Sequence, residues 1–166
     1  MSTADLETMD CAHKAVKAVA TRLGYPELKK EQSEAVLSFV QGKDVFVSLP
    51  TEYGKSLCYG MIPLVVDEMK AHKEPNSILL IVSPLISLMK DQVKHFVAKG
   101  VSAGYVSSEP ENKDMQGRIM REYQLVFISP EALLGTLRWR ALLCESTYRQ
   151  RLVGFVVDEA HCVLKW

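Results

Sequence analysis

The sequence predicts an α/β fold built on a mostly parallel sheet that helices cover on both faces. Two observations predict it. Short apolar runs rich in valine, isoleucine and leucine recur along the chain, as in strands that are buried on both faces. Longer segments with helical periodicity lie between these runs, and strands that alternate with helices in this way form parallel sheets. The chain of 166 residues has the length of one domain.

Two helices are expected at the start of the chain. In the first, apolar residues recur near one face, at Leu6, Met9, Ala12, Val16, Val19 and Leu23. Gly24 is placed to end this helix. The second helix is expected over residues 28–41, with Gly42 as its C-terminal glycine. The apolar run 44–49 then predicts a buried strand, which Pro50 ends.

Helices and strands alternate from this point. A helix is expected to begin near Gly54, and Pro63 is expected to kink it. The remaining strands are predicted at residues 78–82, 102–106, 125–128 and 152–157. The helices between them are predicted at residues 85–99 and 112–123, and from Pro130 through Leu142.

Composition excludes several classes of protein. With 48% hydrophobic and 24% charged residues the chain is globular, not disordered or fibrous. Its 20 basic and 20 acidic residues cancel, so any contact with nucleic acid must come from a local patch. The four cysteines form no CxxC pair, so neither a zinc site nor a disulfide framework is expected. We expect a soluble intracellular protein without a signal peptide or a membrane span.

The tripeptide Gly54-Lys55-Ser56 follows the first predicted strand and opens a helix, where a phosphate-binding loop belongs. Lys55 can reach the β- and γ-phosphates, and Ser56 can bind Mg²⁺. The tripeptide alone would equally describe a solvated turn, and its position between a strand and a helix favours the phosphate site. Glu52 opposes this interpretation, because its Cβ atom and carboxylate come close to where the phosphates would lie.

Asp158 and Glu159 follow the last predicted strand. A polar strand end that faces water would look the same, but together with the upstream loop the pair is typical of a Walker B site. Asp158 would orient Mg²⁺ through its water shell, and Glu159 would position or deprotonate the attacking water. This chemistry requires the two strands to be neighbours in the sheet. The residues by themselves therefore indicate a P-loop nucleoside triphosphatase.

The run Asp158-Glu159-Ala160-His161, a DEAH box, resembles superfamily 2 helicases when it is taken with the loop. Further motifs resemble the RecQ family of ATP-dependent DNA helicases. Residues 81–93 are similar to motif Ia of that family, and residues 49–51 with 54–59 to its motif I. Residues 127–131 resemble the next DNA-side motif. Residues 158–162 with Trp166 resemble motif II, and residues 23–25 with Leu28, Lys29 and Gln32 resemble motif 0. The similarity covers about residues 20–166.

The resemblance implies a P-loop NTPase (RecA-like) fold of three α/β/α layers. Residues 1–166 would be a single RecA-like helicase ATP-binding domain, incomplete and truncated at its C-terminus. Residues 1–42 would carry the adenine-side motif and residues 43–166 the P-loop core. The full-length protein would be a 3′–5′ DNA helicase that couples ATP hydrolysis to translocation on single-stranded DNA and to unwinding, in DNA repair and recombination.

The resemblance also implies cofactors, partners and location. The cofactors would be ATP and Mg²⁺, and the partner of the full-length protein would be single-stranded or forked DNA. The protein would be nuclear in a eukaryote and cytoplasmic otherwise. A second RecA-like lobe, which carries an arginine finger in the family, would be missing from this chain. Without that arginine, hydrolysis is expected to fall by roughly 10³–10⁵, so the isolated chain should bind ATP weakly and not unwind DNA.

Roles carry over residue by residue. Tyr25 would stack on adenine, Gln32 would bind its edge, and Lys29 would lie near the nucleotide. The catalytic set would be Lys55, Asp158, Glu159 and His161, with His161 coupling the nucleotide state to the DNA side. The nucleotide-binding set would be Tyr25, Lys29, Gln32, Pro50, Thr51, Glu52, Tyr53, Gly54, Lys55, Ser56 and Leu57. Ser56 and Asp158 would bind Mg²⁺. The DNA-binding set would be Ser83, Pro84, Ser87, Lys90, Ser129, Pro130 and Trp166.

The chain departs from the family pattern at Glu52, where some helicases have glycine, and at Leu23 and Leu28, where the family usually has aromatic residues. The helix of motif Ia can also simply pack Leu85, Leu88 and Val93 into the core, and both roles are compatible. An alternative from another class remains. The chain would then be a non-catalytic DNA- or protein-binding module that has lost ATP binding through Glu52.

Overall fold

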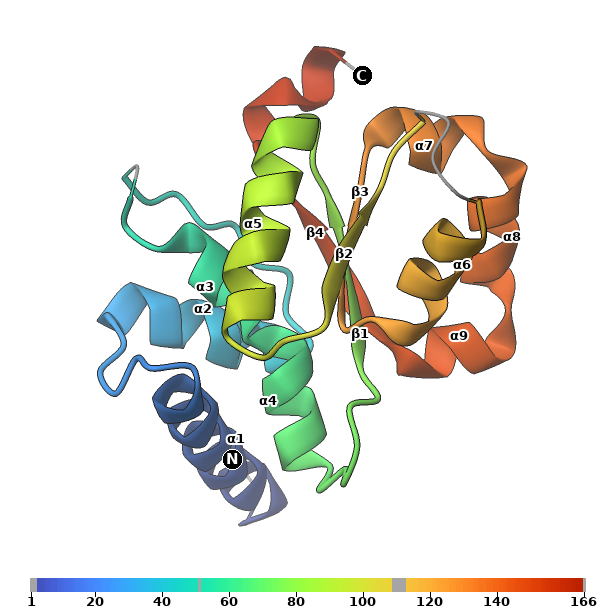
Figure 1. Ribbon diagram of the computed structural model, residues 1–166. Coiled ribbons are helices and arrows are strands. Elements are labelled where there is room, and N and C mark those ends of the chain that lie inside the picture. The colour runs from blue at the N-terminus through green and yellow to red at the C-terminus, as the bar shows by residue number, and fades with distance from the viewer. Residues whose placement is uncertain (1–2, 51, 109–112, 166) are drawn as a thin grey trace. The chain divides into compact units, whose positions relative to one another are not determined.

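The computed structural model describes residues 3–50, 52–108 and 113–165. The chain divides into two compact units, Met1–Asn76 and Ser77–Trp166. The first unit is helical, and its described helices are α1 (Thr3–Arg22), α2 (Lys30–Val40), α3 (Lys55–Gly60) and α4 (Ile62–Met69) (Figure 1). The prediction of one domain with parts at residues 1–42 and 43–166 stays a prediction.

Helices α1 and α2 confirm the first two predicted helices. The buried stripe of α1 includes Ala12, Val16 and Val19, and the helix packs against α2 and α4. Leu6, at its N-terminal end, is half-exposed at 50%. Glycines follow both helices with left-handed backbones, with φ of 87° at Gly24 and 82° at Gly42. Positive φ is cheap only for glycine, which is why these residues end the helices.

The helix predicted from Gly54 with a kink at Pro63 is divided into α3 and α4 at Met61. Pro63 lies in the first turn of α4, where its missing N–H leaves no hydrogen bond unmade. Proline therefore starts a new helix here instead of bending an existing one.

The strand predicted at residues 44–49 is wrong, because these residues form no strand and belong to no ladder among the described strands. Phe46 exposes 85% of its surface, and Val45, Val47 and Leu49 are only half-buried. A strand needs a partner for its backbone N–H and C=O groups, and β-propensity does not supply one. The apolar run is consequently irregular.

The second unit is a four-stranded parallel sheet with helices on both faces. Its strands are β1 (Ile78–Val82), β2 (Ala103–Val106), β3 (Leu125–Ile128) and β4 (Leu152–Val157), in the order β2-β3-β1-β4. Its helices are α5 (Ile86–Ala98), α6 (Lys113–Glu122), α7 (Pro130–Gly135), α8 (Leu137–Cys144), α9 (Ser146–Arg151) and the 3₁₀ helix η1 (Ala160–Lys165). Helix α5 covers one face of the sheet, and α6, α8 and α9 cover the other (Figure 1). This confirms the predicted fold class.

Strand β1 pairs with a neighbour on each side. Leu80 lies opposite Val126 of β3 and Phe155 of β4. All five residues of β1 are buried. Strand β4 is one of the two outer strands of the described sheet, and its Phe155 and Val157 are 52% and 44% exposed. The continuous apolar run predicted at residues 78–82 is thus explained by a central position.

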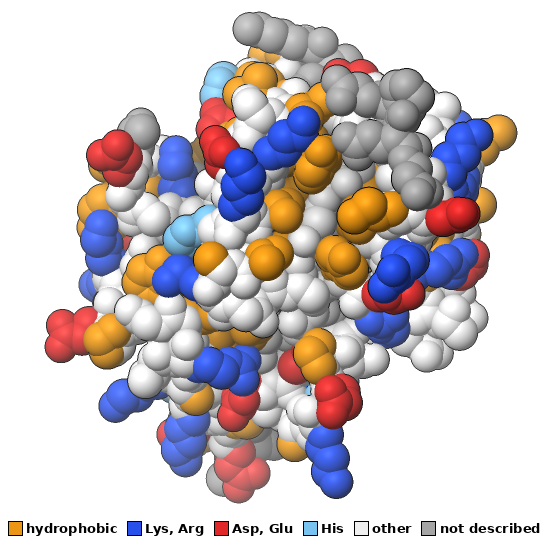
Figure 2. All heavy atoms as spheres, in the orientation of Figure 1, with side chains coloured by type: hydrophobic (Ala, Val, Ile, Leu, Met, Phe, Trp, Pro, Cys, Tyr) orange, Lys and Arg blue, Asp and Glu red, His pale blue; other side chains and the backbone are white. Residues whose placement is uncertain are grey.

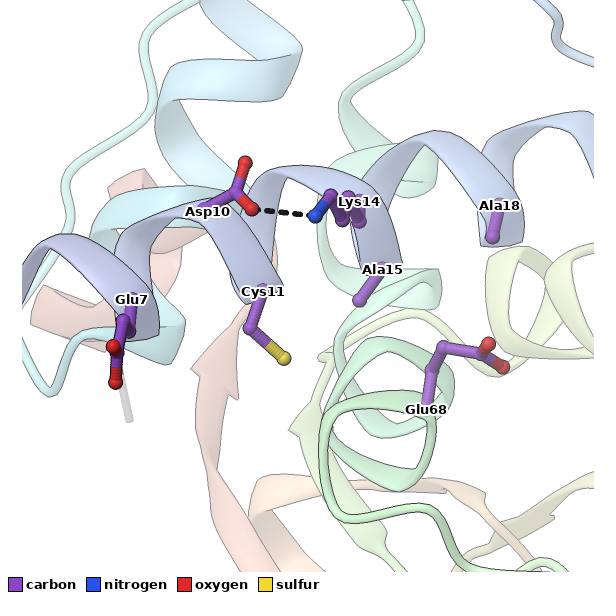
Figure 3. A pocket seen from close by; sticks show the side chains of 7 residues that line it. All are labelled: Glu7, Asp10, Cys11, Lys14, Ala15, Ala18 and Glu68. Carbon is purple, nitrogen blue, oxygen red and sulfur yellow. Dashed lines mark ion pairs between the residues drawn. The ribbon is translucent and has the colours of Figure 1, made fainter.

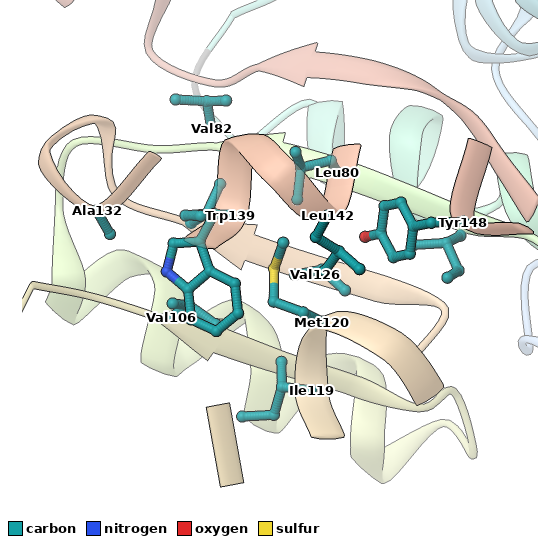
Figure 4. Packing of buried hydrophobic residues seen from close by; sticks show 12 residues of the cluster. Leu80, Val82, Val106, Ile119, Met120, Val126, Ala132, Trp139, Leu142 and Tyr148 are labelled. Carbon is teal, nitrogen blue, oxygen red and sulfur yellow. The ribbon is translucent and has the colours of Figure 1, made fainter. Parts of the chain in front are cut away.

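The main hydrophobic cluster fills the space between the sheet and the helices α6, α8 and α9 (Figure 4). Leu80 and Val126 contribute from the sheet, and Met120, Trp139 and Tyr148 from the three helices. Tyr148 is 3% exposed, and burial raises the pKa of its hydroxyl to about 12. Burial of this kind supplies most of the free energy that stabilises a sheet against helices.

The region after β3 differs in detail from the prediction. The helix expected from Pro130 through Leu142 is broken at Thr136 into α7 and α8, and α9 was not predicted at all. The Arg121 guanidinium of α6 donates to both carboxylate oxygens of Glu145, at 3.0 and 3.2 Å, just before α9 begins. This hydrogen bonding lowers the pKa of Glu145. Helix α9 could not be predicted, because its six residues have few apolar side chains and carry no periodic signal.

In the part of the chain that the structure describes, no helix is long and apolar enough to cross a membrane.

Replacing Leu80 with alanine should lower the free energy of unfolding by about 2–5 kcal/mol, because Leu80 is fully buried in the main cluster. The matched control is Leu137→Ala, since Leu137 is 75% exposed and should change stability by less than about 0.5 kcal/mol. Urea unfolding followed by circular dichroism compares the two variants. Equal losses would contradict the assignment of the core.

Candidate functional site

The predicted phosphate loop lies in the first unit and leads into α3. Gly54 is the N-cap of α3 and has a left-handed backbone with a φ of 85°. A Cβ atom added at Gly54 would lie 2.5 Å from Nε2 of Gln32. Both the backbone angle and the close approach of Gln32 therefore favour glycine at this position.

Three predicted nucleotide-binding residues follow Gly54 in α3. Lys55 is its first residue and is exposed. The side chain of Lys55 has no hydrogen bond or ion pair within the described residues. Ser56 is half-buried, and Leu57 is only 6% exposed. The ammonium of Lys55 is therefore available to an anion from solvent, whereas the side chain of Leu57 belongs to the core.

Gln32 connects the start of α2 to the loop. Its side chain is 5% exposed, and its Nε2 donates to the carbonyl oxygens of Tyr53 and Gly54 at 3.1 and 3.2 Å. Its Oε1 accepts from the backbone N–H of Lys29 at 3.0 Å. The amide nitrogen of Gln32 is thus engaged by the loop itself. The predicted contact with an adenine edge would require these hydrogen bonds to be exchanged.

Lys29 approaches the same loop residue. Its Nζ donates to the Tyr53 carbonyl at 3.3 Å and lies 3.5 Å from the centroid of the Tyr53 ring. Tyr25 lies just after α1, where its N–H donates to the carbonyl of Ala20 at 2.8 Å. Of the predicted nucleotide-binding residues, the structure brings Lys29, Gln32, Tyr53 and Gly54 into direct contact.

Glu52 lies in a turn that the Tyr53 N–H closes by donating to the Pro50 carbonyl at 3.2 Å. Its φ is 64°, an angle at which turns favour glycine, and its side chain is exposed. Pro50 is exposed, and Thr51 lies outside the described residues. The backbone angle therefore also favours glycine at the position of Glu52. That the Glu52 carboxylate repels the phosphates stays a prediction.

In the second unit, the residues that follow the strands lie side by side along one edge of the sheet. The backbone N–H of Asp158 donates to the Val82 carbonyl at 2.9 Å. The N–H groups of Ser83 and Ser129 likewise donate across the sheet, to Ile128 and Val106 respectively, both at 3.1 Å. The strand ends thus form the row Asp158, Ser83 and Ser129 at the carboxyl edge, where parallel α/β sheets bind their ligands.

The three predicted catalytic residues of the DEAH box are in contact with one another. The Asp158 carboxylate accepts from the Glu159 N–H at 3.0 Å, and Nδ1 of His161 lies 3.3 Å from the Glu159 carboxylate. Glu159 has a φ of 54°, an uncommon angle for this residue type. Backbones of this kind are held in place by their surroundings and are frequent at functional sites.

The predicted DNA-binding residues divide by exposure. Ser87 and Lys90 are exposed on α5, and Pro84 is half-buried. Ser83 and Ser129 are 1% and 2% exposed. The Ser129 hydroxyl accepts from the Ala132 N–H at 3.2 Å and so caps α7, in which Pro130 is buried as the first residue. Trp166 lies outside the described residues.

The sequence analysis missed Ser107, which follows β2 and is 4% exposed. It occupies the strand-end position that Ser83 and Ser129 occupy after β1 and β3. Applying the strand-end rule to every predicted strand would have found it. Glu31, whose carboxylate accepts from the Tyr53 hydroxyl at 3.3 Å, was not predicted either. A contact between loop and helix of this kind leaves no local signal in the sequence.

The oxygen donors expected for Mg²⁺ are a hydroxyl and a carboxylate, at Ser56 in the first unit and Asp158 in the second. Such hard oxygen ligands are those that Mg²⁺ prefers, so the residue types fit the ion. Within the described residues, no three His, Cys, Asp or Glu side chains gather as a metal cluster would require.

A shallow hollow of about 470 Å³ lies on the surface of α1 and α4 (Figure 3). Its lining is Glu7, Asp10, Cys11, Lys14, Ala15, Ala18 and Glu68. Lys14 forms an ion pair with Asp10. The predicted nucleotide residues do not line this hollow. On the face drawn in Figure 2, basic and acidic side chains are interspersed, as expected for a chain of zero net charge.

Comparisons with known proteins agree with these features. The profile of the family described as "DEAD/DEAH box helicase" matches residues 29–166. The chain is 40% identical over 145 residues to the ATP-dependent helicase SGS1 of Saccharomyces cerevisiae, covering 85% of this chain and 10% of that protein. It is 33% identical over 171 residues to the ATP-dependent DNA helicase RecQ of Pasteurella multocida, covering 99% of this chain and 24% of that protein. The chain thus spans a tenth to a quarter of these relatives.

Two solved structures share the fold. The DUF1998 helicase MrfA bound to DNA and AMPPNP superimposes with a TM-score of 0.67 at 21% identity, over 89% of this chain and 21% of that one. The helicase Lhr of Mycobacterium smegmatis bound to ssDNA and AMP-PNP gives a TM-score of 0.55 at 17% identity, over 92% of this chain and 20% of that one. Both likenesses confirm the predicted α/β architecture.

Gly54→Ala should destabilise the chain more than Gly42→Ala. Both glycines have a left-handed φ, so either alanine costs about 1 kcal/mol of backbone strain. A Cβ atom at Gly42 meets nothing within 4 Å, whereas one at Gly54 would collide with Gln32. We expect an additional loss of about 1 kcal/mol or more at Gly54 in thermal unfolding. Equal losses would show that the Gln32 side chain moves away from the new Cβ atom without a measurable loss of stability.

Proposed function

The chain belongs to the DEAD/DEAH box helicase family and, within it, to the RecQ type, and from this membership we propose that it is the ATP-binding lobe of a 3′–5′ DNA helicase. The full-length protein would couple ATP hydrolysis to translocation on single-stranded DNA and to unwinding of forked DNA. The observation that carries the ATP-binding part is the loop geometry. Gly54, in a left-handed conformation that favours glycine, is the N-cap of α3 and is followed directly by the exposed Lys55.

Different residues of the chain would bind the phosphates, the adenine side and the Mg²⁺ ion of the nucleotide. Lys55 would bind the β- and γ-phosphates, while Tyr25, Lys29 and Gln32 would bind the adenine side. Ser56 and Asp158 would each supply an oxygen to Mg²⁺. The bound ion neutralises charge on the phosphate oxygens during phosphoryl transfer.

Glu159 would orient the attacking water and accept its proton. Its carboxylate lies 3.3 Å from Nδ1 of His161, so a change at the nucleotide can reach His161 through this contact. Ser87 and Lys90 would contact the DNA backbone, because both are exposed on α5 and carry a hydroxyl and an ammonium suited to phosphate. The buried Ser83, Ser129 and Pro130 would instead shape the edge of the sheet beneath them.

The 166 residues by themselves would bind ATP weakly and hydrolyse it slowly. In this class of enzyme an arginine from a second lobe stabilises the transferring phosphoryl group, and its absence typically costs roughly 10³–10⁵ in rate. Unwinding also requires two lobes that close and open around ATP. We therefore expect nucleotide binding, and not unwinding, to be the measurable activity of this segment.

Lys55→Ala should abolish the stabilisation that ATP and Mg²⁺ give to the chain, and should leave the ligand-free melting temperature unchanged. Lys55 is exposed and makes no described contact, so its loss should cost less than about 0.5 kcal/mol of stability. Differential scanning fluorimetry with and without ATP and Mg²⁺ measures both effects, with Lys70→Ala as the control for an exposed lysine. A nucleotide-induced shift that survives in Lys55→Ala would contradict its assignment to the phosphates.

Glu52→Gly should strengthen nucleotide binding by about tenfold or more, because it removes a carboxylate from the turn that precedes Gly54. Glu74→Gly, an exposed glutamate in another loop of the first unit, is the matched control. Calorimetric titration with ATP and Mg²⁺ provides the dissociation constants. If Glu52→Gly leaves a measurable affinity unchanged, the carboxylate does not oppose the phosphates.

A second candidate function is supported by the positive φ and the exposed carboxylate of Glu52. It is a non-catalytic DNA- or protein-binding module whose loop no longer accepts nucleotide. The absence of nucleotide binding in the wild-type chain, together with its recovery in Glu52→Gly, would favour this alternative.

A further inference from the structure

One residue of the predicted phosphate loop, Tyr53, contacts the start of α2 through its carbonyl, its ring and its hydroxyl. We propose that Tyr53 closes the loop onto Lys29 and Gln32, so that a nucleotide can reach these two residues only after Tyr53 is released. We call Tyr53 with Lys29, Glu31 and Gln32 the Tyr53 clamp. The proposal rests on the proposed ATP-binding function and deepens it, because it makes Tyr53 a determinant of nucleotide affinity.

The backbone of Tyr53 forms hydrogen bonds with Gln32 and Lys29. Its carbonyl oxygen accepts from Nε2 of Gln32 at 3.1 Å and from Nζ of Lys29 at 3.3 Å. Its N–H donates to the carbonyl of Pro50 at 3.2 Å. Phosphate loops bind anions through backbone N–H groups. The N–H group of Tyr53 instead points into the loop and closes a turn. This N–H group is therefore hydrogen-bonded within the loop itself.

The side chain of Tyr53 contacts Lys29 and Glu31. The Lys29 ammonium lies 3.5 Å from the centroid of its ring, within the range of a cation–π interaction. Its hydroxyl donates to the Glu31 carboxylate at 3.3 Å. Burial, and next the charge of Glu31, raise the pKa of the Tyr53 hydroxyl. One aromatic side chain thus bridges a cation and an anion at the start of α2.

These contacts use the groups that the nucleotide would need. The ammonium of Lys29 and the amide of Gln32 are both directed at the Tyr53 carbonyl in the ligand-free loop. When only a fraction of molecules has an open loop, the apparent affinity falls by that fraction. Weakening the clamp should therefore increase affinity without adding any contact to the ligand. Glu52, by contrast, would act on the phosphates after the loop has opened.

The test compares variants that weaken the clamp without altering Lys29 or Gln32. Tyr53→Leu removes the ring and the hydroxyl at similar size, and should bind a fluorescent ATP analogue about threefold to tenfold more tightly. Tyr53→Phe and Glu31→Gln disturb only the hydroxyl–carboxylate contact and should show a smaller gain of about twofold. Glu34→Gln is the control, since Glu34 is exposed on the same helix and pairs with Lys30 at 3.7 Å.

A second readout needs no ligand. Hydrogen–deuterium exchange of the backbone amides at residues 52–58 should be faster in ligand-free Tyr53→Leu than in the wild-type chain and Glu34→Gln. Equal exchange, or an equal or weaker affinity for the analogue in Tyr53→Leu, would overturn the clamp while leaving ATP binding intact. Faster exchange with no nucleotide binding by any variant would instead refute the proposed ATP-binding function, and the competition with it.

Discussion

The parallel ladders on both sides of β1 are the interaction on which the second unit depends. Because β1 is hydrogen-bonded to β3 and β4 and is buried along its whole length, the point where it ends fixes where its neighbours end. Asp158, Ser83 and Ser129 therefore leave the sheet side by side. The acidic pair of the DEAH box owes its position at the carboxyl edge to this register.

The phosphate loop is held in a different way. Its contacts with α2 are hydrogen bonds and a cation–π interaction at or near the surface, formed around Gln32 and Tyr53. Polar contacts of this kind exchange readily with water or with a ligand, whereas the apolar core cannot rearrange so cheaply. Under the proposed function, the sheet edge would hold the acidic pair in a fixed position, and the loop would be the part that adjusts to admit the nucleotide.

The sequence predicts β1, β3 and β4 at their observed bounds, because uninterrupted apolar runs between polar segments describe buried strands well. It fails at residues 44–49, since the same pattern cannot reveal whether a ladder partner is present. The motifs identify Gly54 and Lys55 through their local spacing. They could not reveal the Tyr53 clamp, because Gln32 and Lys29 reach Tyr53 across 21 and 24 residues of sequence. They also place Ser83 and Ser129 toward DNA, whereas the structure buries both.

The most direct test of the account is a titration of the wild-type chain with a fluorescent ATP analogue, in the presence and in the absence of Mg²⁺. The account predicts saturable binding that Mg²⁺ strengthens and that unlabelled ATP displaces. The absence of binding up to millimolar nucleotide would contradict the central claim that this loop is an ATP site.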